Sequence, residues 1–414
     1  MATSRTFQDM LNEYLPYDLL KEEFVKRDYF FGKVEKMTGW KGGNLVVPFK
    51  AAGASSIAFG QLTDSSDISE DKYVRGNVSD YKELWGSMKF KHTDLMQHDG
   101  SIPEKTFLRI LPDTVDSFMD LMKNAASVNL LNGAHFATVS SDATANDGIL
   151  DVDHPERFEI GQKVVVKSST AEVTGYVSEI DMLDLQVLLV TTRGGATVVD
   201  FSADPMLVAD GAKCFHPGAA TGAFTSLRDI VLPASAGGSS TIYGVSKAAQ
   251  PYTQAIVCNG STITATNIVD KIFDAYVTIR TFGKGNPNEV IVSYKHLANI
   301  MKALESSKGA YHIDQTSTKV MAYGWTEISI GGVKGALKII GVQEMADDVI
   351  YFMDWRAVQW HSNGLFRKRI APDGQQYHTI RESSGFSYLL DVCLFGELVC
   401  SRPSYLGAIH SISY

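Results

Sequence analysis

The residue types that most often carry catalysis form no known catalytic pattern in this sequence. Ten histidines are scattered along the chain, and none falls in the HExxH or HxxxH spacing that holds zinc from one helix face. No GxSxG motif is present to expose a nucleophilic serine. Gly283 and Gly285 lie between a predicted helix and a predicted strand, whereas a phosphate-binding loop runs from strand to helix. We interpret these glycines as a turn and expect no cofactor.

One oxygen-rich cluster has the residue types of a calcium site. Its members are Asp142, Asn146, Asp147, Asp151 and Asp153. A calcium loop that starts on an aspartate needs glycine at its sixth position, and Gly148 does not occupy that position. We interpret the cluster as a solvated linker. No metal site is expected, and the chain is not expected to be an enzyme.

The one tight basic cluster consists of Arg367, Lys368 and Arg369. Contact with nucleic acid or a neighbouring protein and a solvated strand end are both open interpretations of such a cluster. The chain as a whole carries a net charge of −9, which disfavours tight sequence-specific DNA binding. A mild negative charge favours solubility at high protein concentration.

Composition indicates a globular protein with two or three domains. The chain has 414 residues, of which 44% are hydrophobic and 21% charged, as is usual for folded proteins. No run of 18 apolar residues predicts a membrane helix, and the first residues contain no apolar core of signal-peptide length. We therefore expect a protein made in a cytoplasm. The four cysteines form no CxxC pair, and we interpret all of them as buried small hydrophobes.

The first hundred residues predict two extended parts. Residues 1–40 have short amphipathic helix patterns and are expected to form an arm that lies on other structure. Residues 41–100 are expected to form one extended hairpin, in which the strands LVVPF and SMKFKHTDL flank a polar tip over residues 51–80. Met88 and Phe90 alternate with lysines in the second strand. Such a hairpin has no core of its own and needs a neighbour for stability.

Residues 101–134 carry the longest helix pattern. Pro112 is expected in the first turn, Gly133 is expected to end the helix, and the apolar stripe is predicted to include Phe118 and Met122. Residues 135–215 change to short alternating strands with polar turns, which predict a small β-barrel or sandwich inserted into the chain.

The stretch 264–313 has the most regular pattern. A helix with Thr266 as its N-cap and a stripe from Ile268 to Ile279 precedes the short strand EVIVS. Ser293 is expected to cap a second helix that ends near Gly309. Residues 216–263 are predicted to connect back to the main body, and residues 341–414 are predicted to be mostly strands.

This order of elements resembles the major capsid proteins of tailed bacteriophages, the Hong Kong phage type of shell fold. The residues that carry the resemblance are LLNG at 130–133 and VIVSYKHLANIMKALESSKGAYHI at 290–313. The resemblance implies an α+β fold with an N-terminal arm, an extended hairpin, a spine helix and a peripheral domain. It also implies a central domain around residues 264–340, with residues 341–414 returning through both domains. Residues 135–215 lie outside the resemblance.

The resemblance implies a structural function: a subunit that forms pentamers and hexamers in an icosahedral shell around double-stranded DNA. The expected place is the virion, after assembly in a host cytoplasm, with no membrane contact. The implied partners are other copies of the chain, a portal, a scaffolding protein and a decoration protein, with non-specific contact to DNA. An encapsulin-like compartment and an unrelated soluble enzyme are the alternatives.

Candidate subunit contacts follow from the hairpin and the basic cluster. We expect them at Lys72, Arg75, Lys82, Trp85, Met88, Phe90, Arg367, Lys368 and Arg369. Some members of the family join a hairpin lysine to an asparagine of a neighbour with the help of a glutamate. Lys72 and Lys82 lie in the expected hairpin, but no matching asparagine and glutamate are found, so non-covalent contacts are expected.

Overall fold

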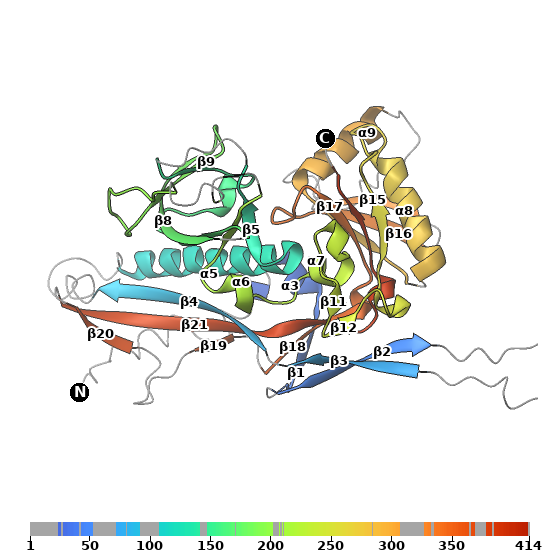
Figure 1. The fold of residues 1–414 in the computed structure, drawn as a ribbon, viewed down its shortest axis with the longest axis horizontal. Coiled ribbons are helices and arrows are strands. Elements are labelled where there is room, and N and C mark those ends of the chain that lie inside the picture. The colour runs from blue at the N-terminus through green and yellow to red at the C-terminus, as the bar shows by residue number, and fades with distance from the viewer. Residues whose placement is uncertain are drawn as a thin grey trace, which may run out of the picture.

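The protein has a mixed α+β architecture in which three six-stranded sheets are arranged around one long helix, and the described residues also form two small two-stranded sheets (Figure 1). The computed structural model describes residues 24–25, 28–40, 43–52, 72–79, 81–91, 107–140, 147–169, 171–201, 207, 209, 211–283, 285–306, 327–332, 335–363, 366–368, 378–382 and 385–412. Most of the predicted arm, residues 1–23, lies outside these ranges. In the described part of the chain, no helix has the length and apolar character needed to cross a membrane.

The first sheet is built on one long strand, β21 (Gly385–Cys400). Its other members are β1 (Glu35–Thr38), β4 (Lys82–Lys91), β18 (Val358–Ser362), β19 (Phe366–Lys368) and β20 (His378–Glu382). β4 pairs antiparallel with β21 from Lys91 opposite Ser387 to Lys82 opposite Gly396. Since β19 also pairs with residues 392–394 of β21, β4 and β19 lie on opposite edges of that strand.

The helix α5 (Phe107–Asn132) lies along the β4–β21 ribbon (Figure 1). A Cβ atom at Gly86 of β4 would lie 2.6 Å from the ring of Phe118 and 2.8 Å from the sulfur of Met122, so glycine lets the strand approach the helix closely. Met119, Met122 and Ala126 are buried, whereas Phe118 is half-buried. The buried side of α5 is thus rotated slightly about the helix axis from the predicted stripe, so that Phe118 lies at its border.

The ends of α5 show which signals act locally. The helix begins at Phe107, ahead of Pro112, so the proline lies inside the helix and not in its first turn. Gly133 ends the helix as predicted: its φ is +111°, and its N–H donates to the carbonyl oxygen of Asn129. A positive φ is a conformation that glycine adopts without strain.

The hairpin differs from the predicted pairing. β2 (Leu45–Ala52) pairs antiparallel with β3 (Lys72–Val78), and the two strands form a sheet by themselves. The predicted second strand, β4, instead pairs with β21, about three hundred residues later in the chain. The strand β3 was hidden in a segment that looked like a polar tip because most of its side chains face solvent. The hairpin therefore closes earlier than expected, and β4 belongs to the body.

Residues 135–215 form a six-stranded antiparallel sheet that closes on itself. Its strands are β5 (His135–Thr138), β6 (Ile149–Asp151), β7 (Lys163–Lys167), β8 (Glu172–Asp181), β9 (Gln186–Val190) and β10 (Lys213–Phe215), and a short 3₁₀ turn, η2 (Pro155–Arg157), follows β6. The order is β5-β10-β7-β8-β9-β6, and a bridge between Val139 and Val152 joins the two ends. Alternate side chains such as Val164, Val166 and Leu189 are buried in a core that is separate from the other two and that also includes Val128 of α5. We call this closed sheet the small barrel.

The third sheet separates two hydrophobic cores. Its strands, in spatial order, are β13 (Ile256–Asn259), β22 (Gly407–His410), β17 (Val349–Met353), β14 (Glu289–Val292), β16 (Gly335–Gly341) and β15 (Glu327–Gly332). Val290 and Val292 of β14 pack in the core under the helices α8 (Ile268–Gly283) and α9 (Tyr294–Ser306). Ile291, between them, points into the main core on the other face. This central strand is buried on both faces, as its continuous apolar sequence indicates.

The two helices largely follow their sequence patterns. Ile272, Tyr276 and Ile279 of α8 are buried as predicted, but Phe273 is 41% exposed. The helix starts at Ile268, so Asn267 and not Thr266 precedes it. The N–H of His296 donates to the Ser293 hydroxyl over 3.4 Å, consistent with the predicted cap of α9. Gly309 and Tyr311, from the resemblance, lie outside the described residues.

Short elements connect these sheets around the main core. They are α3 (Tyr29–Lys33), α6 (Ala219–Gly222), α7 (Leu227–Val231), β11 (Thr241–Ile242), β12 (Val245–Ser246) and the 3₁₀ turns η4 (Ala234–Ala236), η5 (Pro251–Thr253), η6 (Trp355–Ala357) and η7 (Pro403–Tyr405). At the centre of this core, Trp360 makes edge contacts with Phe31 and Phe224, at centroid distances of 5.0 and 5.2 Å. These contacts join α3, β18 and the segment before α7. All four cysteines are free; three are buried, but Cys258 is only half-buried, which corrects that prediction.

Candidate inter-subunit surfaces

The β2–β3 hairpin presents one covered face and one open face. Phe49 is buried and stacks on Tyr243 with a centroid distance of 6.1 Å. On the other face, Val46 is 50% exposed and Tyr73 is 59% exposed. Figure 1 shows both strands extending away from the body. The base is thus anchored by apolar contacts, whereas the open face places large apolar side chains in water.

The predicted contact residues are distributed over three places. Lys72 and Arg75 are exposed on β3, opposite Ala52 and Pro48. Lys82 and Trp85 belong to β4; Trp85 is 49% exposed and its indole N–H donates to Glu83 Oε2 over 2.8 Å. Two of these four residues therefore belong to the β2–β3 hairpin, and the other two belong to the β4–β21 ribbon.

Met88 and Phe90 lie on the β4 backbone, opposite Leu390 and Tyr388, but their side chains lie outside the described part of the structure. Arg367 and Lys368 belong to β19, on the far edge of β21, again without described side chains. Arg369 lies outside the described residues. The predicted contact residues that the structure describes thus lie on three elements: the β2–β3 hairpin, β4 and, on the other side of β21, β19. They do not form one site.

A groove that the sequence did not predict lies between β4, α5 and the small barrel. Its volume is about 730 Å³. Trp85 lies in the β4 wall, and Phe118 and Leu121 lie in the α5 wall. Ile160, which is 73% exposed, lies in the barrel wall. The three walls come from segments far apart in the chain, and Leu121 and Ile160 look like core residues in their local patterns. Only the tertiary arrangement exposes them.

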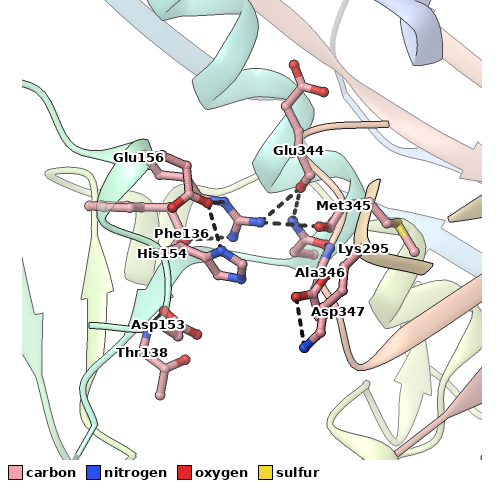
Figure 2. A network of polar contacts seen from close by, with 12 residues as sticks. Phe136, Thr138, Asp153, His154, Glu156, Lys295, Glu344, Met345, Ala346 and Asp347 are labelled. Atoms are coloured by element: carbon pink, nitrogen blue, oxygen red, sulfur yellow. Dashed lines mark hydrogen bonds and ion pairs between the residues drawn. The ribbon is translucent and has the colours of Figure 1, made fainter. Parts of the chain in front are cut away.

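A polar junction fastens the small barrel to the body (Figure 2). The Arg157 guanidinium donates to the carbonyl oxygen of Phe136 over 2.8 Å and to those of Glu344 and Met345 over 3.3 and 3.4 Å. The Asn132 side chain, at the end of α5, donates to the same Glu344 carbonyl oxygen and accepts from the Ala346 N–H over 2.9 Å. One loop of the body thus receives both the barrel and the helix.

The charges around this junction are complementary. Lys123 of α5 lies 3.1 Å from the Glu344 carboxylate, and Lys295 lies 3.7 Å from Asp347. Burial lowers the pKa of Arg157, although Glu156 and Asp153 oppose that shift. Since arginine stays charged far above neutral pH, the junction keeps its hydrogen bonds under ordinary conditions.

Two histidines beside the groove are held neutral. Burial lowers the pKa of His216 to about 4, and burial together with the nearby Lys213 and Arg228 lowers that of His135 to about 4. His216 Nδ1 lies 3.2 Å from Gln162 Nε2, and its ring packs 4.6 Å from that of Phe136. Neutral rings suit these apolar surroundings, but neither histidine has a nucleophile or a metal-ligand set beside it in the described structure.

Two buried glutamates hold segments together. The Glu289 carboxylate accepts hydrogen bonds from Tyr29 over 2.7 Å, from Lys33 over 2.8 Å and from the Trp355 indole. Burial alone would raise the pKa of Glu289, but these hydrogen bonds outweigh it and lower the pKa. Burial raises the pKa of Glu397 to about 7, although the Thr225 N–H donates to it. Glu289 therefore anchors α3 as a carboxylate, whereas Glu397 changes charge near neutral pH.

Two carboxylates of the oxygen-rich cluster accept hydrogen bonds from backbone N–H groups, one within a local turn and one between β5 and the segment that follows β6. Asp147 accepts from the Ile149 N–H over 3.0 Å, and Asp153 accepts from the Thr138 N–H over 2.7 Å. Asp142 and Asn146 lie outside the described residues. Among the residues whose placement is described, no group of three or more histidine, cysteine or acidic side chains could hold a metal ion.

Comparisons with known proteins give structural neighbours alone. No protein-family model matches the sequence, and no curated protein matches it. Among solved structures, a cyanophage A-1(L) capsid has a TM-score of 0.46 and 12% identity, covering 93% of this chain and 92% of that chain. The capsid of a native GTA particle has a TM-score of 0.47 and 8% identity, with 92% and 89% covered. The SrpI encapsulin of Synechococcus elongatus has a TM-score of 0.40 and 8% identity, with 100% and 93% covered.

Proposed function

We propose that this chain is the structural subunit of an icosahedral shell of the tailed-phage capsid type. The β2–β3 hairpin is the observation that carries the proposal. Among the described strands, β2 and β3 pair only with each other, and a two-stranded hairpin is marginally stable in water. Val46 and Tyr73 are exposed large apolar side chains that the described part of their own subunit does not cover. A neighbouring copy, repeated by symmetry, covers them.

The long ribbon supports the same proposal. β21 has 16 residues and β4 has 10, whereas strands in compact domains are usually about 5–6 residues long. Together with α5, the ribbon forms an elongated platform (Figure 1). An elongated platform with a projecting hairpin suits a subunit that spans part of a thin shell. It suits a compact catalytic domain much less well.

Each region receives a role in this proposal. The third sheet with α8 and α9 is the central domain, around which copies form pentamers and hexamers. The β4–β21 ribbon with α5 is the peripheral domain, and α5 is its spine helix. The small barrel is an inserted domain on the outer surface. Lys72, Arg75, Lys82 and Trp85 contact neighbouring subunits, and the basic cluster at 367–369 contacts a neighbour or packaged DNA.

The proposed partners follow from a closed shell that is filled with double-stranded DNA. They are other copies of the chain, a portal, a scaffolding protein and a decoration protein. Assembly is proposed to occur in a host cytoplasm, and the finished protein is part of the virion. The fold itself needs no enzymatic activity, cofactor or membrane for this role.

Purified full-length protein tests the proposal directly. Sedimentation velocity and negative-stain microscopy, with and without a co-expressed scaffolding protein, are expected to give rings and closed particles. A stable monomer at high concentration under both conditions would contradict the proposal. A small monodisperse oligomer with a catalytic activity would favour a soluble enzyme instead.

The contents of purified particles separate the two kinds of shell. Protected double-stranded DNA in particles from an infected or induced host is expected for a capsid. An enclosed cellular enzyme, with no nucleic acid, would instead favour an encapsulin-like compartment.

A further inference from the structure

The outer face of α8 combines apolar and acidic side chains. Phe273 is 41% exposed and Val277 is 39% exposed. Asp270 and Asp274 are exposed beside them. The positions 270, 273, 274 and 277 follow the i, i+3, i+4 and i+7 spacing of one helix face. The face that α8 turns away from its sheet is therefore an apolar strip with a negative border.

The outer face of α9 has the opposite charge. Tyr294 is 52% exposed, and Ala298 lies one turn later on the same side. Lys295 and Lys302 are exposed next to them. Lys295 has one ion pair, with Asp347 at 3.7 Å. Within the described part of the chain, neither the Lys302 ammonium nor the Asp274 carboxylate is in a salt bridge. α9 therefore offers an apolar strip with a positive border.

The helices α8 and α9 lie in one layer on the third sheet, and each covers a different side of that sheet. Both helices pack on the same core and contact each other along their adjacent sides, but α8 also contacts β13 and β22, whereas α9 contacts β16. In the order β13-β22-β17-β14-β16-β15, these strands belong to opposite sides of the sheet. Figure 1 shows the two helices next to each other on the outside of this region, with the outer face of each turned away from the sheet. A second copy can thus approach the α9 side while the α8 side remains open for another.

We propose that α8 of one copy docks on α9 of the next copy, with Asp274 facing Lys302 and Phe273 packing beside Tyr294. The proposal deepens the shell function proposed above and rests on it. The contact is heterologous, because two different surfaces meet, and heterologous contacts close into rings when the rotation between copies permits it. The partner is therefore another copy of this chain, and the product is a ring.

In this contact, complementary charge determines which helix faces pair, and burial of apolar surface stabilises the pair. One exposed ion pair contributes only about 0–1 kcal/mol. Bringing two surfaces of the same charge together costs more, so α8 against α8 or α9 against α9 is disfavoured. The apolar strips contribute through burial of Phe273, Val277 and Tyr294. Repetition around a ring then makes a weak contact cooperative.

The test is a charge exchange in full-length protein. Asp274→Lys and Lys302→Asp are each expected to reduce the assembled fraction, measured by sedimentation velocity, by about tenfold or more, which corresponds to ~1.4 kcal/mol. The combined variant is expected to return to within about twofold of the wild type, since the pair is restored with reversed sign. Control reversals at the exposed barrel residues Glu179 and Lys163 are expected to change nothing.

Mixing the two single variants sharpens the test. Subunits with Asp274→Lys have lysine on both faces, and subunits with Lys302→Asp have aspartate on both faces. Only alternation of the two variants pairs opposite charges everywhere, and alternation closes rings with an even number of subunits. Six-membered rings without closed particles are therefore expected from the mixture, because a five-membered ring cannot alternate.

The outcomes separate this inference from the proposed function. If the wild type assembles and both single reversals assemble equally well, the α8–α9 contact is wrong and the shell function stands. The contact is also wrong if the combined variant fails to recover assembly while its circular dichroism and melting temperature match the wild type. A wild-type chain that remains monomeric under all conditions would overturn both.

Discussion

The small barrel and the β2–β3 hairpin both project from the body, yet they differ in what stabilises them. The barrel closes its sheet through Val139 and Val152 and encloses its own apolar core. The hairpin has two strands, a buried base around Phe49 and an open face at Val46 and Tyr73. A closed sheet leaves no exposed strand edge, whereas a hairpin leaves two. We infer that the barrel is stable by itself and that the hairpin gains its stability from another copy.

Attachment to the body differs in the same way. The barrel is held by hydrogen bonds from Arg157 to the carbonyl oxygens of Glu344 and Met345, in a loop that also binds Asn132, and its core includes Val128 of α5 (Figure 2). The hairpin is held at its base alone, where Phe49 stacks on Tyr243 and the Asn77 N–H donates to the Tyr243 carbonyl oxygen over 2.9 Å. Attachment through both a polar loop and a shared core fixes the orientation of the barrel, whereas attachment at one end leaves the other end of the hairpin free to adapt. In the proposed shell, the barrel would thus be placed rigidly, and the hairpin would adjust to different neighbours.

The largest effect is expected from a cavity in the barrel core. Leu189→Ala removes a fully buried side chain and is expected to reduce the stability of the barrel by about 2–5 kcal/mol. Hydrogen exchange should increase in residues 147–201 and stay unchanged in β14 and β17. The matched change Val46→Ala on the hairpin is expected to cost less than about 0.5 kcal/mol in the isolated subunit. Equal loss of protection in barrel and body would show that they unfold together and would contradict the comparison.

A smaller effect is expected at the junction. Arg157→Ala leaves the Glu344 and Met345 carbonyl oxygens without a donor from the barrel and is expected to cost about 1–3 kcal/mol. Barrel orientation should then vary, which cryo-electron microscopy of particles would record as weakened barrel density beside an unchanged shell. Glu156→Ala is the control, since its carboxylate lies 2.8 Å from His154 Nδ1 and 4.0 Å from Arg157 Nε, so its loss leaves the bonds from Arg157 to the body loop in place. Sharp barrel density in the Arg157 variant would contradict a clamping role.

Acidification is expected to lower the stability of the small barrel and to raise that of the main body around Glu397. The pKa of His216 is lowered to about 4 in the folded protein, so the unfolded chain binds a proton first as the pH falls below about 6.5. Barrel stability is therefore expected to decrease between pH 6.5 and 4. The pKa of Glu397 is raised to about 7, so its contribution is greatest below about pH 4.5 and is lost as the pH rises through 7.

Hydrogen exchange at pH 7.5 and 5.5 measures both effects in one sample. Protection should fall around β5 and β10 and rise around the Glu397 end of β21. His216→Gln is expected to reduce the acid effect at the barrel without changing the effect at β21, and Glu397→Gln is expected to do the reverse. A uniform response in both regions, or no change in either variant, would show that other groups control the pH dependence.

The sequence predicted those features whose causes lie within a few residues. Gly133 ends α5 because the positive φ that stops the helix is a property of that residue alone. Ser293 precedes α9 because its hydroxyl accepts a hydrogen bond from the N–H of His296, three residues later. The buried stripe of α8 also followed from spacing, except at Phe273. That exception has a physical reason: a helix that covers one sheet buries one stripe, so an apolar residue beyond it marks a second surface.

The sequence could not predict features that depend on distant partners. β4 carries a regular alternating pattern, but nothing in it identifies β21 as its partner. Asn132 and Arg157 look like surface residues until Glu344 and Met345 are brought to them. The groove wall at Ile160 has the same origin. For the candidate contacts, the sequence found residue types and not their arrangement, so Lys72 and Trp85 were expected in one hairpin but belong to two sheets.

The smallest effect on the subunit is expected from shortening the hairpin between β2 and β3. Replacing residues 53–71 with a Gly-Ser turn leaves the paired register and the buried Phe49 in place. Melting temperature and circular dichroism of the subunit should remain as in the wild type, because the sequence of this segment is mostly polar or small and offers little apolar area to a core. Particle formation should nevertheless be lost or strongly weakened, since contacts repeated over every subunit disappear at once. If the shortened protein aggregates as a monomer, the segment contributes to the core of its own subunit; if it forms particles of normal heat resistance, the hairpin does not hold neighbouring copies together. Either result would remove the distinction between a barrel that is stable alone and a hairpin that needs a partner.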